Sequence, residues 1–386
     1  MTEATLPIVP DLLCFSHLRW DFVFQRPQHL LTRFAHERRV FFIEEPHFDA
    51  QTPRMDLREA DAGVRVAVPH LPEGLDEQAR IDALRGLVDG LLKAEDVNRY
   101  VSWYYTPMAL PFSRHLTPLA VAYDCMDELS LFRGAPAALV DLERELLSRA
   151  DVVFTGGQSL YEAKKDRHPN AHPFPSSVDV PHFQRAREAQ PDPVDQANIP
   201  HPRLGFFGVL DERLDLDLLR GLAEARPQWQ IVLIGPVVKI DPAMLPKAPN
   251  IHYLGMKKYA ELPAYLAGWD VALLLFARNE ATRYISPTKT PEYLAAGKPV
   301  VSTSIRDVVS PYGARGYVEI ADTPADFVSA VEACLRPDSE RQARADHFLA
   351  KMSWDETFSR MKRLLDQSAQ HRQKARTAQG RTAEAQ

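Results

Sequence analysis

The chain has 386 residues, 45% of them hydrophobic and 25% charged, a composition typical of soluble globular proteins long enough for two domains. Its 46 basic and 52 acidic residues give a formal charge of −6, so we expect no nucleic-acid partner. The three cysteines lack CxxC spacing, no apolar run approaches the length of a membrane span, and the N-terminus lacks the layout of a signal peptide. A cytoplasmic protein is expected.

Short apolar runs typical of buried strands alternate with amphipathic stretches along the whole chain. The first series of predicted strands is 12–16, 40–44, 64–69, 100–104, 119–124 and 151–157, with helices at 27–37, 75–94 and 136–150. The second series is 203–208, 229–235, 250–255, 270–276, 298–303 and 316–320. This alternation predicts an α/β protein with two doubly wound, Rossmann-like parallel sheets that face a cleft.

A polar, proline-rich stretch separates the two series, and a capping box at Ser353 and Glu356 begins a last helix. The predicted segments are an N-terminal domain (1–184), a linker (185–201), a C-terminal domain (202–352), a crossover helix (353–366) and a disordered tail (367–386).

The stretch YISPTKTPEYLAAGKPVV, residues 284–301, contains a helix of about two turns. We expect Thr290 to be its N-cap, Pro291 its first residue and Gly297 its C-terminal stop. The hydroxyls of Ser286 and Thr288, the Lys289 cation and free backbone N–H groups would then converge, a combination that suits a phosphate or diphosphate.

Ligands of such folds bind at the carboxyl ends of the strands, where Gly208, Gly235 and Asp124 are expected. The motifs GxGxxG, GxxxxGK[ST], HExxH and GxSxG are absent from the sequence, which removes the usual arguments for dinucleotide enzymes, P-loop NTPases, zincins and serine hydrolases. Asp215 and Asp217 have the spacing of a metal–diphosphate motif, but a helix start explains them better, so no metal is predicted.

Several stretches together resemble GT-B glycosyltransferases, most nearly the family 4-type enzymes of the teichuronic-acid and spore-coat branch. They are SHLRWDFVFQRPQHLLTRFA (16–35), YDCMDELSLF (123–132), FPSSVDVPHF (174–183) and ISPTKTPEYLAAGKPVVST (285–303). The resemblance covers roughly residues 11 to 365. It implies transfer of a sugar from a nucleoside-diphosphate sugar, UDP- or GDP-linked, with no bound cofactor, to a hydroxyl of a cell-surface glycan or lipid-linked precursor.

Carried over residue by residue, the resemblance implies that Glu292 accepts hydrogen bonds from the ribose and that the Ser286–Thr290 loop contacts the diphosphate. Lys289 and the helix amides would neutralise that leaving group without a metal. The alternative is that Glu292 only stabilises its helix and that Lys289 is a solvated charge. The expected donor residues are Gly208, Arg213, Gly235, Ser286, Thr288, Lys289, Thr290 and Glu292.

The N-terminal domain is expected to bind the acceptor through the loop after the first strand, with His17, Trp20, Arg26 and His29 as candidates. Pro27 suits a first helical position, and Trp20 serves equally well as a packing anchor. An inverting enzyme needs a base for the acceptor hydroxyl. Asp127 is the first candidate and Asp124 the second, although either suits a helix cap.

The sequence departs from the family pattern at three places. The first glutamate of the family's pair, which is associated with a retaining reaction, is replaced by Tyr284. Either Glu280 substitutes for it, or the role is empty and the retaining outcome is not supported. Leu210 replaces an arginine, for which Arg213 is the candidate. Ser176 and Ser177 replace an Asn-Gly pair.

Two other functions stay open from the sequence. One is a non-catalytic nucleotide-sugar sensor or scaffold, which Tyr284 makes conceivable, and the other is a UDP-sugar epimerase of the same shape. Peripheral membrane contact is also open, through Arg33, Arg38 and Arg39 or the basic tail, although a solvated surface is the commoner cause of such clusters.

Overall fold

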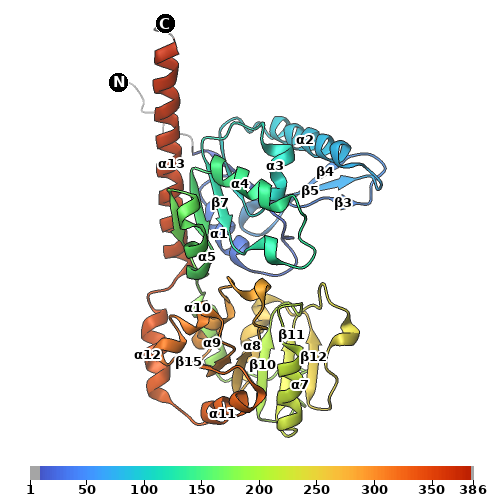
Figure 1. The fold of residues 1–386 in the computed structure, drawn as a ribbon, viewed down its shortest axis with the longest axis vertical. Coiled ribbons are helices and arrows are strands. Elements are labelled where there is room, and N and C mark those ends of the chain that lie inside the picture. Colours follow the sequence, from blue (N-terminus) through green and yellow to red (C-terminus); the bar gives the residue numbers. More distant parts are fainter. Residues whose placement is uncertain (1–8, 384–386) are drawn as a thin grey trace.

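The computed structural model describes residues 9–383, with side chains described as far as residue 375. Two α/β domains lie one above the other, and a long C-terminal helix runs along the side of the N-terminal domain (Figure 1). Each domain has one largely parallel sheet, so the predicted two-sheet GT-B class is confirmed.

The N-terminal sheet has the strand order β3-β5-β2-β1-β6-β7-β8-β9, with β4 antiparallel to β5 and all other pairs parallel. Its strands are β1 Asp11–Phe15, β2 Val40–Ile43, β3 His47–Phe48, β4 Arg54–Glu59, β5 Val64–Leu71, β6 Tyr100–Tyr104, β7 Val121–Cys125, β8 Val152–Thr155 and β9 Ala171–Pro173. The sequence analysis did not predict β3, β4 or β9. All are short or exposed, so they lack the continuous apolar run by which buried parallel strands are recognised.

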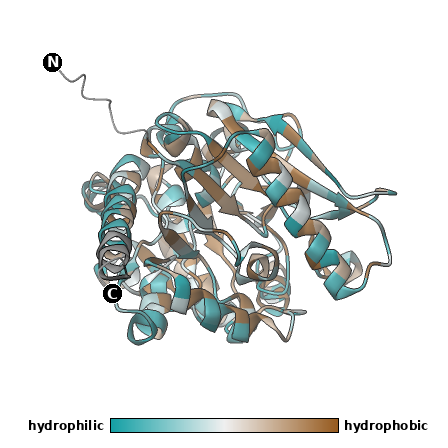
Figure 2. Ribbon diagram, turned by 90° about the horizontal axis from the view of Figure 1, so that it is seen from above, coloured by the Kyte–Doolittle hydropathy of each residue, from teal (hydrophilic) through white to brown (hydrophobic). Residues whose placement is uncertain are grey.

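Helices cover both faces of this sheet. One face packs against α1 (Arg26–Ala35) and α13 (Trp354–Ala383), whose Trp354, Met361 and Leu365 belong to its core. The other face packs against α2 (Glu77–Ala94), α3 (Leu110–Ser113), α4 (Leu139–Arg149) and α5 (Gln158–Lys164). Viewed from above, apolar residues gather in the central strands while the outer helix faces are polar (Figure 2).

The C-terminal sheet is entirely parallel, in the order β12-β11-β10-β13-β14-β15, the arrangement of a Rossmann domain. Its strands are β10 Arg203–Phe207, β11 Gln230–Ile234, β12 Ile251–Gly255, β13 Val271–Leu274, β14 Val300–Ser302 and β15 Val318–Ile320. Its helices are α7 Leu216–Ala225, α8 Leu262–Ala267, α9 Lys289–Ala295, α10 Arg306–Val309, α11 Pro324–Cys334 and α12 Ser339–Leu349; α6 Val180–Gln184 precedes the sheet.

The C-terminal helix is longer than predicted. Ser353 accepts a hydrogen bond from the Glu356 N–H, as expected of a cap, but the helix continues to Ala383, so the predicted disordered tail is wrong up to that residue. Beyond its predicted end at residue 366, the helix still contacts the N-terminal domain. Arg372 pairs with Asp151 at 2.6 Å, and Ser368 is buried. The last three residues of the predicted tail, 384–386, lie outside the described residues.

The basic cluster at Arg33, Arg38 and Arg39 is neutralised within the fold. Arg33 pairs with Asp355, Arg38 with Asp366 and Arg39 with Asp11. These ion pairs weaken the case for membrane contact through this cluster. Within residues 9–383, no helix is long and apolar enough to span a bilayer.

Candidate active site

A cavity of about 1110 Å³ lies between the two domains, at the carboxyl ends of both sheets. His17 follows β1, Asp127 follows β7, Gly208 follows β10 and Gly235 follows β11, and all four line the cavity. The fold therefore brings together residues that are far apart in the sequence, as expected for a cleft between two open α/β sheets.

Helix α9 contributes the donor-side residues of the cavity, but its start differs from the prediction. The helix begins at Lys289 with Thr288 as its N-cap, so Thr290 and Pro291 lie within the first turn. Thr290 is fully buried and does not line the cavity, which makes its predicted ligand role wrong. Pro291 is tolerated there because the first four N–H groups of a helix have no partner within it. Gly297 ends the helix as predicted, with φ +76°.

Ser286, Thr288, Lys289 and Glu292 do line the cavity, as the sequence predicted. The Lys289 stem lies against Gly208, whose φ of +145° and lack of a side chain allow this close approach. Within the described part of the chain, the Lys289 ammonium and the Glu292 carboxylate make no hydrogen bond or close ion pair; the ammonium lies 6.0 Å from the centre of the Phe207 ring.

Burial perturbs this pair strongly. Desolvation raises the pKa of Glu292 to about 8, against the opposing attraction of Lys289. Desolvation also lowers the pKa of Lys289, which the Arg213 charge reinforces and the Glu292 charge opposes. A desolvated acid and amine with no hydrogen-bonding partner among the described residues are suited to a ligand that has both donor hydroxyls and negative charge.

Asp211 is a charged residue on the C-terminal side of the cavity that the sequence analysis did not identify. Asp211 is buried and accepts two hydrogen bonds from the Arg213 guanidinium, at 3.0 and 2.7 Å, so Arg213 lines the cavity in a fixed orientation. The Arg213 guanidinium also stacks 5.5 Å from the centre of the Phe132 ring of the other domain. The only sequence signal for Asp211 is its position three residues after the strand-end Gly208.

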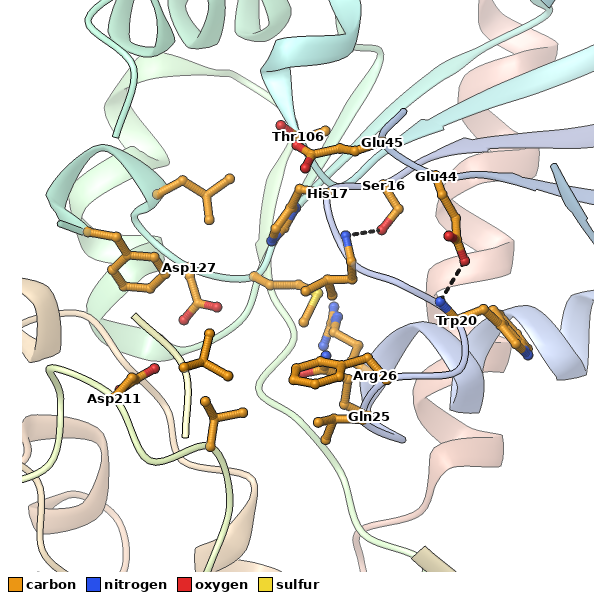
Figure 3. Close-up of a pocket in the computed structure, with 18 of the residues that line it drawn as sticks. Ser16, His17, Trp20, Gln25, Arg26, Glu44, Glu45, Thr106, Asp127 and Asp211 are labelled. Carbon is orange, nitrogen blue, oxygen red and sulfur yellow. Dashed lines mark hydrogen bonds between the residues drawn. The ribbon is translucent and has the colours of Figure 1, made fainter. Parts of the chain in front are cut away.

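Asp127 reaches the cavity from the N-terminal domain, while Asp211 approaches from the C-terminal domain (Figure 3). Burial raises the pKa of Asp127, the Arg213 charge opposes that shift and the Asp211 charge adds to it. Asp127 thus keeps a raised proton affinity at the boundary between the domains, which is the property required of a general base.

The prediction for Asp124 as a base is wrong. It lies within β7 and is fully buried, where it forms a two-pronged ion pair with Arg26, with an Nη2–Oδ1 distance of 2.8 Å. Arg26 lines the cavity but its guanidinium is consumed by this pair and by the Phe174 carbonyl at 2.7 Å. Both residues therefore form a buried pair inside the N-terminal domain, where removal of one partner would leave an uncompensated charge. The Arg26 guanidinium is engaged there and is not directed at an acceptor.

The other residues predicted to bind the acceptor also differ in whether their side chains reach the cavity. His17 lines the cavity, its Nδ1 has no hydrogen-bond partner within the described residues, and burial together with Lys239 lowers its pKa to about 4. His29 does not line the cavity. It stacks on Trp354 with ring centres 4.5 Å apart, so its role is to pack α1 against α13. The Trp20 indole packs against Phe42 in the core and is turned away from Asp127, although the residue borders the cavity (Figure 3).

Glu280 is not a substitute for the missing family glutamate. It lies in a short 3-10 turn outside the cavity, where its side chain is 72% exposed and pairs with Arg283 at 3.6 Å. Tyr284, at the family position itself, packs against the core of the N-terminal domain. The carboxylate role at this position is therefore not filled by either residue.

No group of three or more histidine, cysteine or acidic residues within the described chain is arranged to hold a metal ion. Asp215, one member of the candidate motif, caps α7 by accepting a hydrogen bond from the Leu218 N–H at 2.9 Å. Asp217 pairs on the surface with Arg220.

Known proteins share both sequence and architecture with this chain. A family model described as "Glycosyl transferase-like" matches residues 215–366. The Bacillus subtilis protein TuaH, named as a glycosyltransferase of teichuronic acid biosynthesis, is 27% identical over 274 residues, which is 65% of this chain and 68% of TuaH.

Two solved structures illustrate the shared fold. Sucrose-phosphate synthase of Thermosynechococcus elongatus has a TM-score of 0.65 at 14% identity, with 93% of this chain and 99% of that chain covered. HepE of Anabaena, solved with UDP and glucose, has a TM-score of 0.65 at 14% identity, with 92% and 99% covered. The chain therefore has the GT-B fold, and the family-model match and the relative show that it is similar in sequence to glycosyltransferases.

Proposed function

We propose that this glycosyltransferase moves a hexose-type sugar from a UDP-sugar to a hydroxyl of a cell-surface glycan or lipid-linked precursor, in the cytoplasm and without a metal ion. The observation that carries the proposal is the pair formed by Lys289 and Glu292. Both line the interdomain cavity, both have pKa values shifted by burial, and neither side chain has a hydrogen bond from a described residue.

The donor would lie across the carboxyl edge of the C-terminal sheet. The Glu292 carboxylate accepts hydrogen bonds from the two ribose hydroxyls, a good match for an acid with two acceptor oxygens. Lys289 and Arg213 place positive charge beside the diphosphate, and Gly208 allows Lys289 this position because a side chain at 208 would collide with the lysine. These cations supply the charge stabilisation that a divalent ion gives in other sugar transfers.

The acceptor hydroxyl would approach from the N-terminal side. Asp127, which borders the cavity with a raised pKa, takes the hydroxyl proton as the new glycosidic bond forms. Direct attack at the sugar carbon with a carboxylate base gives inversion. The location of Asp127, and the absence of Glu280 from the cavity, favour that outcome over retention.

Relatives support the UDP-sugar choice. HepE was solved with UDP and glucose, and a trehalose-6-phosphate enzyme of Escherichia coli, with a TM-score of 0.60, was solved with UDP-2-fluoro glucose. A role in a surface polysaccharide is suggested by TuaH, the relative named for teichuronic acid biosynthesis. An acidic group positioned for an acceptor argues for transfer rather than for a donor sensor or an epimerase.

Calorimetric titration with UDP, GDP, TDP and their sugars tests the proposal. We expect UDP compounds to bind, with affinity unchanged by EDTA, and a UDP-sugar to be consumed only when an acceptor is added. Absence of binding by every nucleotide would refute the donor site. Tight binding of GDP compounds alone would show that the nucleobase of the donor is guanine and not uracil. Conversion of the donor without an acceptor would favour the epimerase.

A further inference from the structure

The Phe132 ring of the N-terminal domain lies against two cations of the C-terminal domain. The guanidinium carbon of Arg213, in the loop after β10, is 5.5 Å from the ring centre, and the Lys239 ammonium, in the loop after β11, is 5.7 Å from it. All three residues line the interdomain cavity. Phe132 belongs to the segment between β7 and α4 that also carries Asp127, so one ring connects the donor side of the cavity with the loop of the proposed base.

Apolar packing does not explain the position of this ring. Phe132 is half-buried, and it belongs to none of the three hydrophobic cores of the described chain. The face of an aromatic ring attracts a cation, and it does so more strongly when both groups are shielded from water. The contacts with the two cations therefore account for the ring better than core packing does.

The Arg213 guanidinium is held from two directions. Along one edge, Nε and Nη2 donate to the Asp211 carboxylate at 3.0 and 2.7 Å, while the guanidinium lies over the Phe132 ring of the other domain. Its third nitrogen, Nη1, makes no hydrogen bond with a described residue. A fixed cation with free N–H donors is suited to a phosphate oxygen, and it loses little conformational freedom when it binds one.

We propose that Phe132 is a positioning residue for the donor, because it keeps the Arg213 guanidinium where Nη1 can bind the diphosphate. This inference rests on the proposed function, since it takes the diphosphate of a UDP-sugar as the ligand of Arg213. The N-terminal domain then contributes to diphosphate binding across the cleft, although Phe132 itself makes no contact with the nucleotide.

The test measures Kd for UDP and for uridine by calorimetric titration of the full chain. Phe132→Leu keeps an apolar side chain but removes the ring face, so we expect the Kd for UDP to rise about three- to thirtyfold. The Kd for uridine, which has no phosphate, should stay unchanged. Phe132→Tyr restores a ring and should bind UDP as the unmodified protein does.

Double variants and a matched control make the assignment specific. Because Phe132 acts through Arg213, adding Phe132→Leu to Arg213→Ala should not weaken UDP binding further, whereas adding it to Lys239→Ala should. Phe48→Leu is the matched control, since Phe48 is a 43% exposed phenylalanine that lines the same cavity from the same domain. Its Kd for UDP should equal that of the unmodified protein.

Equal UDP affinity of Phe132→Leu and the unmodified protein would overturn the inference. A loss of the same size for UDP and uridine would also overturn it, because such a loss would indicate a general disturbance of the cleft. An undiminished effect of Phe132→Leu in the Arg213→Ala background would do the same.

Each of these results requires UDP to bind the unmodified protein, so the proposed donor site would stand. Absence of UDP binding by the unmodified protein would instead refute that site. If Phe132→Leu fails to fold, Phe132→Met, measured in the same way, replaces it, since it also removes the ring and keeps an apolar side chain.

Discussion

The side chain of Lys289 lies directly over Gly208, so closely that a methyl group at position 208 would come within 2.2 Å of the lysine Cε. The glycine after the first strand of the C-terminal domain and the lysine at the start of α9 therefore form one unit, although 81 positions separate them in the sequence.

The Gly208→Ala substitution should displace Lys289 and weaken UDP binding at least tenfold. It should also cost about 1–3 kcal/mol of unfolding free energy, because the φ of +145° disfavours any side chain. Gly255→Ala is the matched control: its φ is +70°, but a methyl group there would meet nothing within 4 Å. Thermal melting of both variants measures the cost of backbone strain, and calorimetry measures the effect of displacing Lys289 on UDP binding. If the two variants bound UDP with equal affinity, Gly208 would not be needed to position Lys289.

The Lys289→Ala substitution should raise the barrier for transfer by roughly 2–4 kcal/mol, about 30- to 1000-fold in kcat/KM, because the departing diphosphate loses its nearest cation. Steady-state kinetics with the UDP-sugar identified by titration measures the effect. Lys351→Ala, at an exposed position at the end of α12, removes the same charge from the surface and should leave the rate unchanged. Unchanged turnover and donor affinity in the Lys289 variant would refute its assignment.

Replacing the proposed base by Asp127→Asn should lower turnover by about 10²- to 10⁴-fold while leaving UDP affinity within a factor of three. The amide keeps the shape of the side chain but cannot accept the hydroxyl proton. The control is Asp141→Asn on the exposed face of α4. A variant with full activity would exclude Asp127 as the base.

Binding of uridine should strengthen as pH rises from 6.5 to 8.5. Burial raises the pKa of Glu292 to about 8, so the ionised form that accepts ribose hydroxyls is scarce at the lower pH. Because apparent affinity scales with the competent fraction, Kd should fall by about tenfold or more over this interval. Glu292→Gln should bind more weakly and show a flat profile; the same slope in that variant would assign the titration to another group.

Protein stability should fall in mild acid because His29 is held neutral. Burial lowers the pKa of His29 to about 3, so the folded state resists a proton that the unfolded chain takes up below pH 6.5. The contribution of neutral His29 to the free energy of unfolding is fully present above pH 6.5 and is lost as pH falls. Between pH 6.5 and 4.5 the free energy of unfolding should decrease by about 2 kcal/mol.

His29→Phe keeps a ring in contact with Trp354 but removes the titrating group. Denaturant unfolding at the two pH values should show a smaller loss for this variant. His36→Phe, on the C-cap of α1, serves as a control. An identical loss in the His29 variant and the unmodified protein would contradict the assignment.

Local sequence determined much of this protein. The alternation of apolar runs and amphipathic stretches identified two parallel sheets. The segment 284–301 identified a short helix with Lys289 and Glu292 at the cavity and Gly297 at its end. These features follow from neighbouring residues, through strand and helix periodicity, dipole preference and the freedom of glycine, so a linear pattern is enough to find them.

Tertiary structure alone decided which polar residues near the strand ends reach the cavity. Asp124 and Asp127 are three positions apart, yet Asp124 is buried against Arg26, 98 positions away, while Asp127 borders the cavity. The same long-range packing placed His29 on Trp354, buried Thr290 and brought Ser368 and Arg372 of α13 against the N-terminal domain. Such outcomes depend on burial by partners distant in the chain, and desolvation by those partners is also what shifts the pKa values of the site.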